Sequence, residues 1–119
     1  MEMQYLLLIY DEETKWNAIP AAEQQKIHQR YGVFSQEIRT AGKLLGANQL
    51  QPSSTATTVR VRDGKKLVTD GPFAETKEQL GGYYLVEAKD LDEALSLAAR
   101  IPSAEMGSIE VRPIVERHG

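Results

Sequence analysis

Residues 70–84, DGPFAETKEQLGGYY, hold a turn, a charged run and the start of an apolar strand in one short segment. Asp70 can hydrogen-bond to its own backbone, Gly71 is held extended because a proline follows it, and Pro72 has a fixed φ. The segment therefore predicts a sharp turn and, after it, a strand that opens at Gly81-Gly82 and runs over 83–88. The turn is either purely structural, or it directs the Asp70 carboxylate into a cleft as a base, an acid or a polar anchor.

Upstream of this segment the sequence predicts two strands with a long helix between them. Residues 3–10 are apolar at nearly every position, as in a strand that is covered on both faces. From residue 20 to 41 apolar side chains recur with the spacing of one buried helical stripe. The stripe consists of Ile27, Tyr31, Phe34 and Ile38. A second strand is expected over 43–50.

A β-hairpin lies between that second strand and the DGP turn. Val59 and Val61 alternate with polar residues and are followed by Asp63-Gly64, the dipeptide that suits the positive φ angles of a type I′ turn. Residues 65–69 are expected to form the returning strand.

Beyond residue 88 the pattern predicts a second helix and a last strand. Asp90 and Glu93 have the spacing of a capping box, and Pro102 ends the helix. The stripe expected to be buried is Leu91, Ala94, Leu95, Ala98 and Ile101. Residues 108–114 alternate between apolar and charged side chains and contain Pro113, which favours an edge strand.

This order of elements predicts an α+β fold of the ferredoxin-like βαββαβ type with an inserted hairpin, in a single domain over residues 1–119. Two helices cover only one face of such a sheet, yet the strands at 3–10 and 83–88 are apolar on both faces. We therefore expect a second copy of the chain to cover the other face, which makes the protein a homodimer.

The composition argues against several classes of function. The chain has no cysteine, so neither a disulfide framework nor a cysteine-ligated zinc site is available. Its net charge is −3 and its lysines and arginines are scattered, which argues against direct binding of nucleic acid. The apolar run at 5–10 is too short for a signal core or a membrane span, so we expect a cytoplasmic protein with no membrane contact.

The stretch from Asp70 resembles the DGPF signature of the YCII-related family. The resemblance also covers residues 5–10, 51–52, 57–65 and 107–114. It implies a dimeric α+β barrel with clefts at its ends. It also implies a site built from a histidine on the first helix and an aspartate beside a Gly-Pro turn, and Asp70 matches that aspartate.

The histidine of that pattern falls at or near Tyr31 in this chain, and His28 lies one turn earlier. The two are three residues apart and share a helical face. Asp70, His28 and Tyr31 are therefore the candidate catalytic residues, although spacing alone favours a surface histidine at position 28 over a catalytic one. A tyrosine is a poor general base at neutral pH unless its pKa is strongly lowered.

Four further residues are candidates for ligand binding. Lys77 and Glu78 lie on the loop after the turn, where they either attract a ligand or form a solvated pair. Tyr83 and Arg112 lie on strands, where a core or outward-facing role competes with a place in the cleft. Two histidines far apart make no metal motif, and the sequence contains no Gly-rich nucleotide-binding loop, so no metal and no cofactor are implied.

Two classes of function remain open. One is a homodimer whose cleft binds a small polar or aromatic molecule, with lyase-like or isomerase-like acid–base chemistry centred on Asp70. The alternative is a non-enzymatic binding or regulatory module, since DGPF-type proteins resemble partners of sigma-factor-linked transcription. Convergent ionisable groups in the cleft would favour the enzyme, and a flat apolar groove would favour the module.

Overall fold

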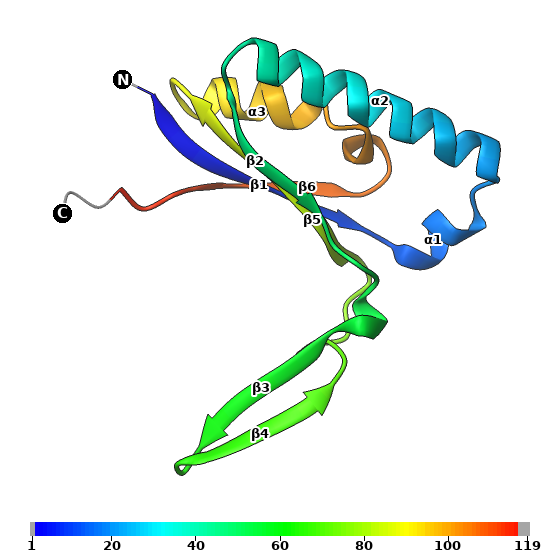
Figure 1. Ribbon diagram of the computed structural model, residues 1–119, viewed down its shortest axis with the longest axis vertical. Helices are drawn as coiled ribbons and strands as arrows, with labels where there is room; N and C mark the ends of the chain where they lie inside the picture. The colour runs from blue at the N-terminus through cyan, green and yellow to red at the C-terminus, as the bar shows by residue number, and fades with distance from the viewer. Residues whose placement is uncertain (1, 117–119) are drawn as a thin grey trace.

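The computed structural model describes residues 2–116, which form a four-stranded sheet, helices on one face of that sheet, and a projecting hairpin (Figure 1). The elements in chain order are β1 (Met3–Asp11), α1 (Glu13–Ala18), α2 (Ala21–Thr40), β2 (Leu44–Gln49), η1 (Ser53–Thr55), β3 (Thr57–Arg62), β4 (Lys65–Asp70), β5 (Gln79–Ala88), α3 (Leu91–Ala99), η2 (Pro102–Glu105) and β6 (Ser108–Pro113).

The main sheet has the strand order β2-β5-β1-β6, and all three neighbouring pairs are antiparallel. With β3 and β4 set apart as a two-stranded sheet, the remaining elements follow the ferredoxin-like βαββαβ order. The predicted fold class is confirmed. Pro113 lies at the end of β6, an edge strand, where its missing N–H removes no hydrogen bond from the ladder.

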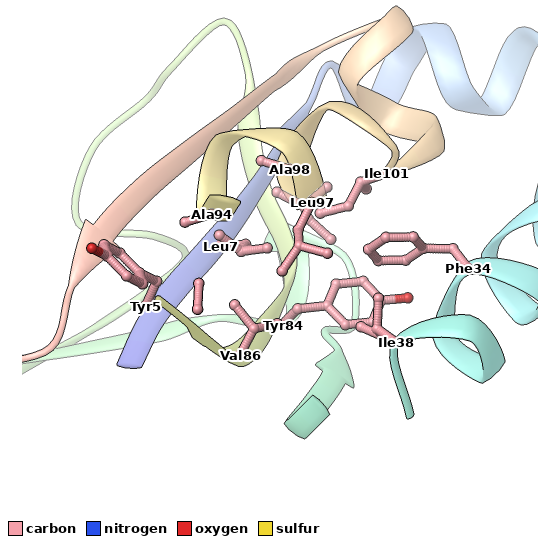
Figure 2. Packing of buried hydrophobic residues seen from close by; sticks show 12 residues of the cluster. Tyr5, Leu7, Phe34, Ile38, Tyr84, Val86, Ala94, Leu97, Ala98 and Ile101 are labelled. Carbon is pink, nitrogen blue, oxygen red and sulfur yellow. The ribbon is translucent and has the colours of Figure 1, made fainter. Parts of the chain in front are cut away.

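The hydrophobic core lies between the sheet and helices α2 and α3 (Figure 2). Alternate residues of the central strands point into it, because successive side chains of a strand face opposite ways. Phe34 packs edge-on against Tyr84 with ring centroids 5.2 Å apart. The buried cluster is Tyr5, Leu7, Ile9, Phe34, Ile38, Tyr84, Val86, Ala88, Ala94, Leu97, Ala98 and Ile101. On β1 and β5 the residues between these, such as Leu8 and Leu85, lie on the face that carries no helix.

Two elements differ from the sequence-based expectation in where they begin or whether they were expected. A short helix, α1, lies between β1 and α2, where only a polar connection was expected. The strand β5 begins at Gln79 instead of at the glycine pair, because Gln79 and Leu80 still pair with the end of β1. Gly82 is required there for another reason, since a Cβ atom would lie 2.8 Å from the backbone oxygen of Asn48 on the neighbouring strand.

The buried stripe of α3 is rotated from its predicted position. Leu91 and Leu95 are exposed, whereas Leu97 is buried together with Ala94 and Ala98. Both sets have helical spacing, so the sequence pattern alone could not separate them. The cap of α3 is confirmed in part, because Asp90 accepts a hydrogen bond from the backbone N–H of Glu93, while the Glu93 carboxylate reaches the N–H of Lys89.

The hairpin of β3 and β4 projects away from the sheet and helices (Figure 1). Asp63 and Gly64 have φ angles of 52° and 73°, which confirms the predicted positive-φ turn. The hairpin gives the chain a radius of gyration of 16.5 Å. A compact chain of this length would have a radius of about 13.5 Å.

Candidate functional site

A cavity of about 440 Å³ opens where the end of β1, helices α1 and α2 and the strands β2 and β5 meet. This volume lies in the usual range for small-molecule sites. Its lining residues are Ile9, Asp11, Glu13, Trp16, Asn17, His28, Tyr31, Ala47, Asn48, Gln49, Leu50, Gln51, Pro52, Gln79, Gly81, Gly82, Tyr83, Tyr84 and Ser103.

Three polar side chains from separate elements meet inside the cavity. Tyr31 comes from α2, Ser103 from η2 and Asp11 from the last position of β1. The hydroxyl groups of Tyr31 and Ser103 lie 2.5 Å apart, and the Ser103 side chain lies close enough to Asp11 to lower the pKa of its carboxyl group. Ser103 is 4% exposed, so its hydroxyl depends on the bond to Tyr31.

The surroundings shift the pKa values of two of these groups. Burial raises the pKa of Asp11, the hydrogen bond from Ser103 opposes that rise, and the charge of Glu78 adds to it. Burial is also the main reason why the pKa of Tyr31 rises to about 12, and the charge of Asp11 contributes to the rise. Tyr31 therefore keeps its proton at neutral pH, as a hydrogen-bonding group and not as a base.

The close approach of Gly107 fixes the orientation of the Asp11 side chain. Gly107, just before β6, lies against the end of β1. A Cβ atom at residue 107 would collide with the backbone oxygen of Tyr10 and lie 2.6 Å from Oδ1 of Asp11. Only glycine allows this approach, so the orientation of the carboxylate depends on Gly107.

Helix α1, which lines the cavity, is hydrogen-bonded to two other segments of the chain. The Glu13 carboxylate accepts hydrogen bonds from the backbone N–H and the hydroxyl of Ser53 on η1. The backbone N–H of Glu13 donates to Oε1 of Gln79, 2.9 Å away, while Nε2 of Gln79 donates to the backbone oxygen of Thr76 at 2.6 Å. These bonds tie η1, α1 and the loop after the DGP turn together. On α1, Trp16 packs edge-on against His28 of α2 with 5.4 Å between ring centroids.

Three of the residues predicted from the sequence line this cavity. His28 and Tyr31 do so from α2 and Tyr83 does so from β5. The Tyr83 hydroxyl accepts a hydrogen bond from Nδ2 of Asn48, 2.8 Å away. His28 is exposed overall, and its ring packs edge-on against Trp16.

The other predicted residues lie elsewhere in the single chain. Asp70 is the exposed last residue of β4, opposite Thr57, and does not line the cavity. Glu78 accepts a hydrogen bond of 2.8 Å from the Ser108 hydroxyl, and Lys77 is exposed on the loop. Arg112 is exposed on β6 opposite Leu6. None of these placements tests a role in function, so the roles stay predictions.

Sequence reasoning missed Asp11, Glu13, Trp16 and Ser103 as site residues. Two signals were present, since Asp11 directly follows an apolar strand and Trp16 is the only tryptophan. Ser103 carried no signal, because its importance depends on contacts with segments far away in sequence. Among residues 2–116, no group of three or more histidine or acidic side chains is arranged to hold a metal ion. The second histidine, His118, lies outside the described residues.

No helix within the part of the chain that the structure describes has the length and apolar character to cross a membrane.

Comparison with known proteins agrees with the resemblance seen in the sequence. The YCII-related domain matches residues 3–118. A protein of Rhizobium meliloti (strain 1021), described as uncharacterised, is 40% identical over 114 residues, which cover 94% of this chain and 92% of that protein. The match spans nearly the whole chain, including the segments that build the cavity. This chain therefore belongs to the YCII-related family.

Proposed function

We propose that this protein is a homodimer whose cavity binds a small polar or aromatic molecule and transfers a proton on it, as a lyase or isomerase of cyclic substrates does. The observation that carries the proposal is the meeting of Asp11, Ser103 and Tyr31 in a cavity of about 440 Å³. Convergent ionisable groups inside a cavity are the feature that distinguishes an enzyme site from a flat docking groove.

The roles follow from the chemistry of each group. Asp11 is the proton acceptor, because burial raises the pKa of its carboxyl group toward the range in which a base is effective. Tyr31 and Ser103 lie near the carboxylate and hydrogen-bond to polar atoms of the substrate. The rings of Trp16 and Tyr83 give the apolar part of a substrate a surface on which to lie.

Asp70 stays the second candidate for the base, through the resemblance to the family's Gly-Pro turn. It ends a hairpin that projects from the single chain, so a role in chemistry requires it to approach a cavity in the dimer. The two carboxylates are therefore tested side by side.

The homodimer is supported by two surfaces. Helices cover one face of the sheet, and on the other face Leu6, Leu8 and Leu85 are partly exposed. The hairpin exposes Val59, Val61 and Val68 on one face, each between 55% and 63% exposed. An isolated two-stranded hairpin is marginally stable in water, so these valines need a partner surface.

The charge distribution favours a second copy of the chain as that partner. Residues 57–70 carry four of the 14 basic side chains and two of the 17 acidic ones, which leaves ten basic and fifteen acidic side chains elsewhere. The basic hairpin of one copy and the acidic remainder of the other copy therefore attract each other. Sedimentation at micromolar concentration should give twice the chain mass of 13.3 kDa; a stable monomer contradicts the homodimer.

The exposed hairpin also supports the alternative, a binding module without catalysis, and one experiment separates the two. A panel of cyclic ketones, lactones, phenols and amines is screened by NMR, and each compound that binds is incubated with the protein in D₂O. If the protein transfers protons on its ligand, carbon-bound protons of at least one bound compound should exchange with the solvent. Binding without any exchange favours the module.

Three variants assign the exchange to a residue. Asp11→Asn should abolish it, whereas Glu116→Gln, an exposed carboxylate away from the cavity, should leave it unchanged. If Asp70→Asn abolishes exchange and Asp11→Asn does not, the base is Asp70. No binding by any compound of the panel contradicts the proposed function itself.

A further inference from the structure

The charges that line the cavity have one sign. Its acidic side chains are Asp11 and Glu13, and among the described residues that line it none is a lysine or an arginine. Among the described lining residues the only basic side chain is His28, which is exposed and packs edge-on against Trp16. Glu78 adds a further negative charge close enough to act on Asp11. An anionic ligand would therefore meet repulsion, while a cation would be attracted.

Both lining carboxylates have acceptor capacity to spare, because an ionised carboxylate has about four lone-pair sites. Glu13 accepts two hydrogen bonds from Ser53, one on each oxygen, which fix its orientation toward η1. Asp11 lies near the Ser103 and Tyr31 side chains, so it is the carboxylate that a ligand meets beside these hydroxyl groups.

The hydroxyl groups of Tyr31 and Ser103 hydrogen-bond to each other, and either oxygen can be the donor. That bond uses one of their two protons. The Asp11 carboxylate, when ionised, can only accept. The complementary ligand group for this carboxylate is therefore rich in N–H donors.

We infer, on the basis of the proposed binding function, that the cavity takes an organic amine in its cationic form. The ammonium group binds Asp11 and the lone pairs of Tyr31, and the apolar body of the amine lies along Trp16 and Tyr83. Aromatic faces next to the carboxylate strengthen this choice, because the π-face of tryptophan or tyrosine attracts a cation. The cavity volume suits an amine that carries one ring.

The test uses three compounds of one shape and different charge: 2-phenylethylamine, 2-phenylethanol and 3-phenylpropionate. The chain has a single tryptophan, Trp16, and it lines the cavity, so its fluorescence reports occupancy directly. At pH 7 the amine should bind at least about tenfold more tightly than the alcohol, because hydrogen bonds to charged groups are the strong ones. The carboxylate should bind more weakly than the alcohol.

Asp11→Asn should reduce the affinity for the amine to that for the alcohol, while Glu116→Gln changes neither. If Asp11→Asn does not fold, the dependence of binding on salt concentration in the native protein tests the inference instead. Sodium chloride should weaken the binding of the amine and leave that of the alcohol unchanged.

Equal affinities for the amine and the alcohol, or tighter binding of the carboxylate, would overturn the inference and leave a neutral or anionic ligand for the proposed function. No response of Trp16 to the amine also overturns it. The proposed function is judged separately, by binding of the wider panel of cyclic compounds and by proton exchange on the compounds that bind.

Discussion

Replacing Tyr31 by phenylalanine tests the polar cluster at its most buried contact. The substitution removes the hydroxyl 2.5 Å from Ser103 and leaves the ring in place. Ser103 is 4% exposed, and the substitution removes one hydrogen bond between two neutral hydroxyl groups. We expect a destabilisation of about 1 kcal/mol.

That free energy translates into a measurable change in melting temperature. Unfolding entropies of about 2.1 cal/mol/K per residue give roughly 0.25 kcal/mol/K for a chain of this length. The melting temperature should therefore fall by about 4 °C, measured by circular dichroism at one fixed protein concentration. Tyr5→Phe is the matched control, because within residues 2–116 the one partner of the Tyr5 hydroxyl is the sulfur of Met3, at 3.7 Å. Its effect should be smaller.

A double-mutant cycle shows whether the cost arises from the contact itself. Tyr31→Phe should cost about 0.5–1 kcal/mol less in a Ser103→Ala background than in the native protein, because its partner is already absent. Identical costs in the two backgrounds, or an unchanged melting temperature for Tyr31→Phe, would refute the hydrogen-bonded cluster.

The remaining predictions concern Asp11, the glycine beside it and the hairpin turn. Since burial raises the pKa of Asp11 in the folded state, the fold favours its protonated form, so the contribution of Asp11 to stability is greatest at acid pH and is lost as pH rises through the folded pKa. In melts from pH 3 to 7, Asp11→Asn should gain stability relative to the native protein as pH rises; a constant difference contradicts this. Gly107→Ala should destabilise by about 1–3 kcal/mol in urea titrations and weaken binding of 2-phenylethylamine, because the new methyl group displaces Asp11. Unchanged binding would show that the carboxylate is not held by this contact. Gly64→Val should cost about 1 kcal/mol or more because residue 64 has a φ of 73°, and an unchanged melting temperature would argue that the hairpin adds nothing to global stability.

The elements that could be predicted from the sequence are those set by local rules. Asp63-Gly64 specified its turn by backbone conformation alone, and the periodicity of α2 placed Phe34 and Ile38 in the core. The stripe of α3 was misplaced because Leu91 and Leu97 satisfy the same spacing. Only the strands beneath the helix decide between them, and that information is tertiary.

The candidate site was predicted in part, at His28 and Tyr31 on one helix and at Tyr83 on a strand. His28 and Tyr31 were found because three-residue spacing puts both on one face. The contact between Tyr31 and Ser103 joins residues 72 apart in sequence, and no local pattern indicates it. Burial raises the pKa of Asp11, and the close approach of Gly107 fixes its orientation. Both are properties of the folded chain.

The projecting hairpin has a consequence for how the protein is handled by proteases. It is fastened at its base by the bond from the N–H of Gly71 to the oxygen of Ala56 and by the bond from the Thr58 hydroxyl to the oxygen of Gly71. Its exposed strands hold four trypsin cleavage sites, at Arg60, Arg62, Lys65 and Lys66. In dilute solution trypsin should cut here first. Cleavage leaves two large fragments, one that ends before residue 63 and one that begins after residue 65. If a second copy covers the hairpin, digestion at high protein concentration should spare these sites, so the cleavage rate measures assembly.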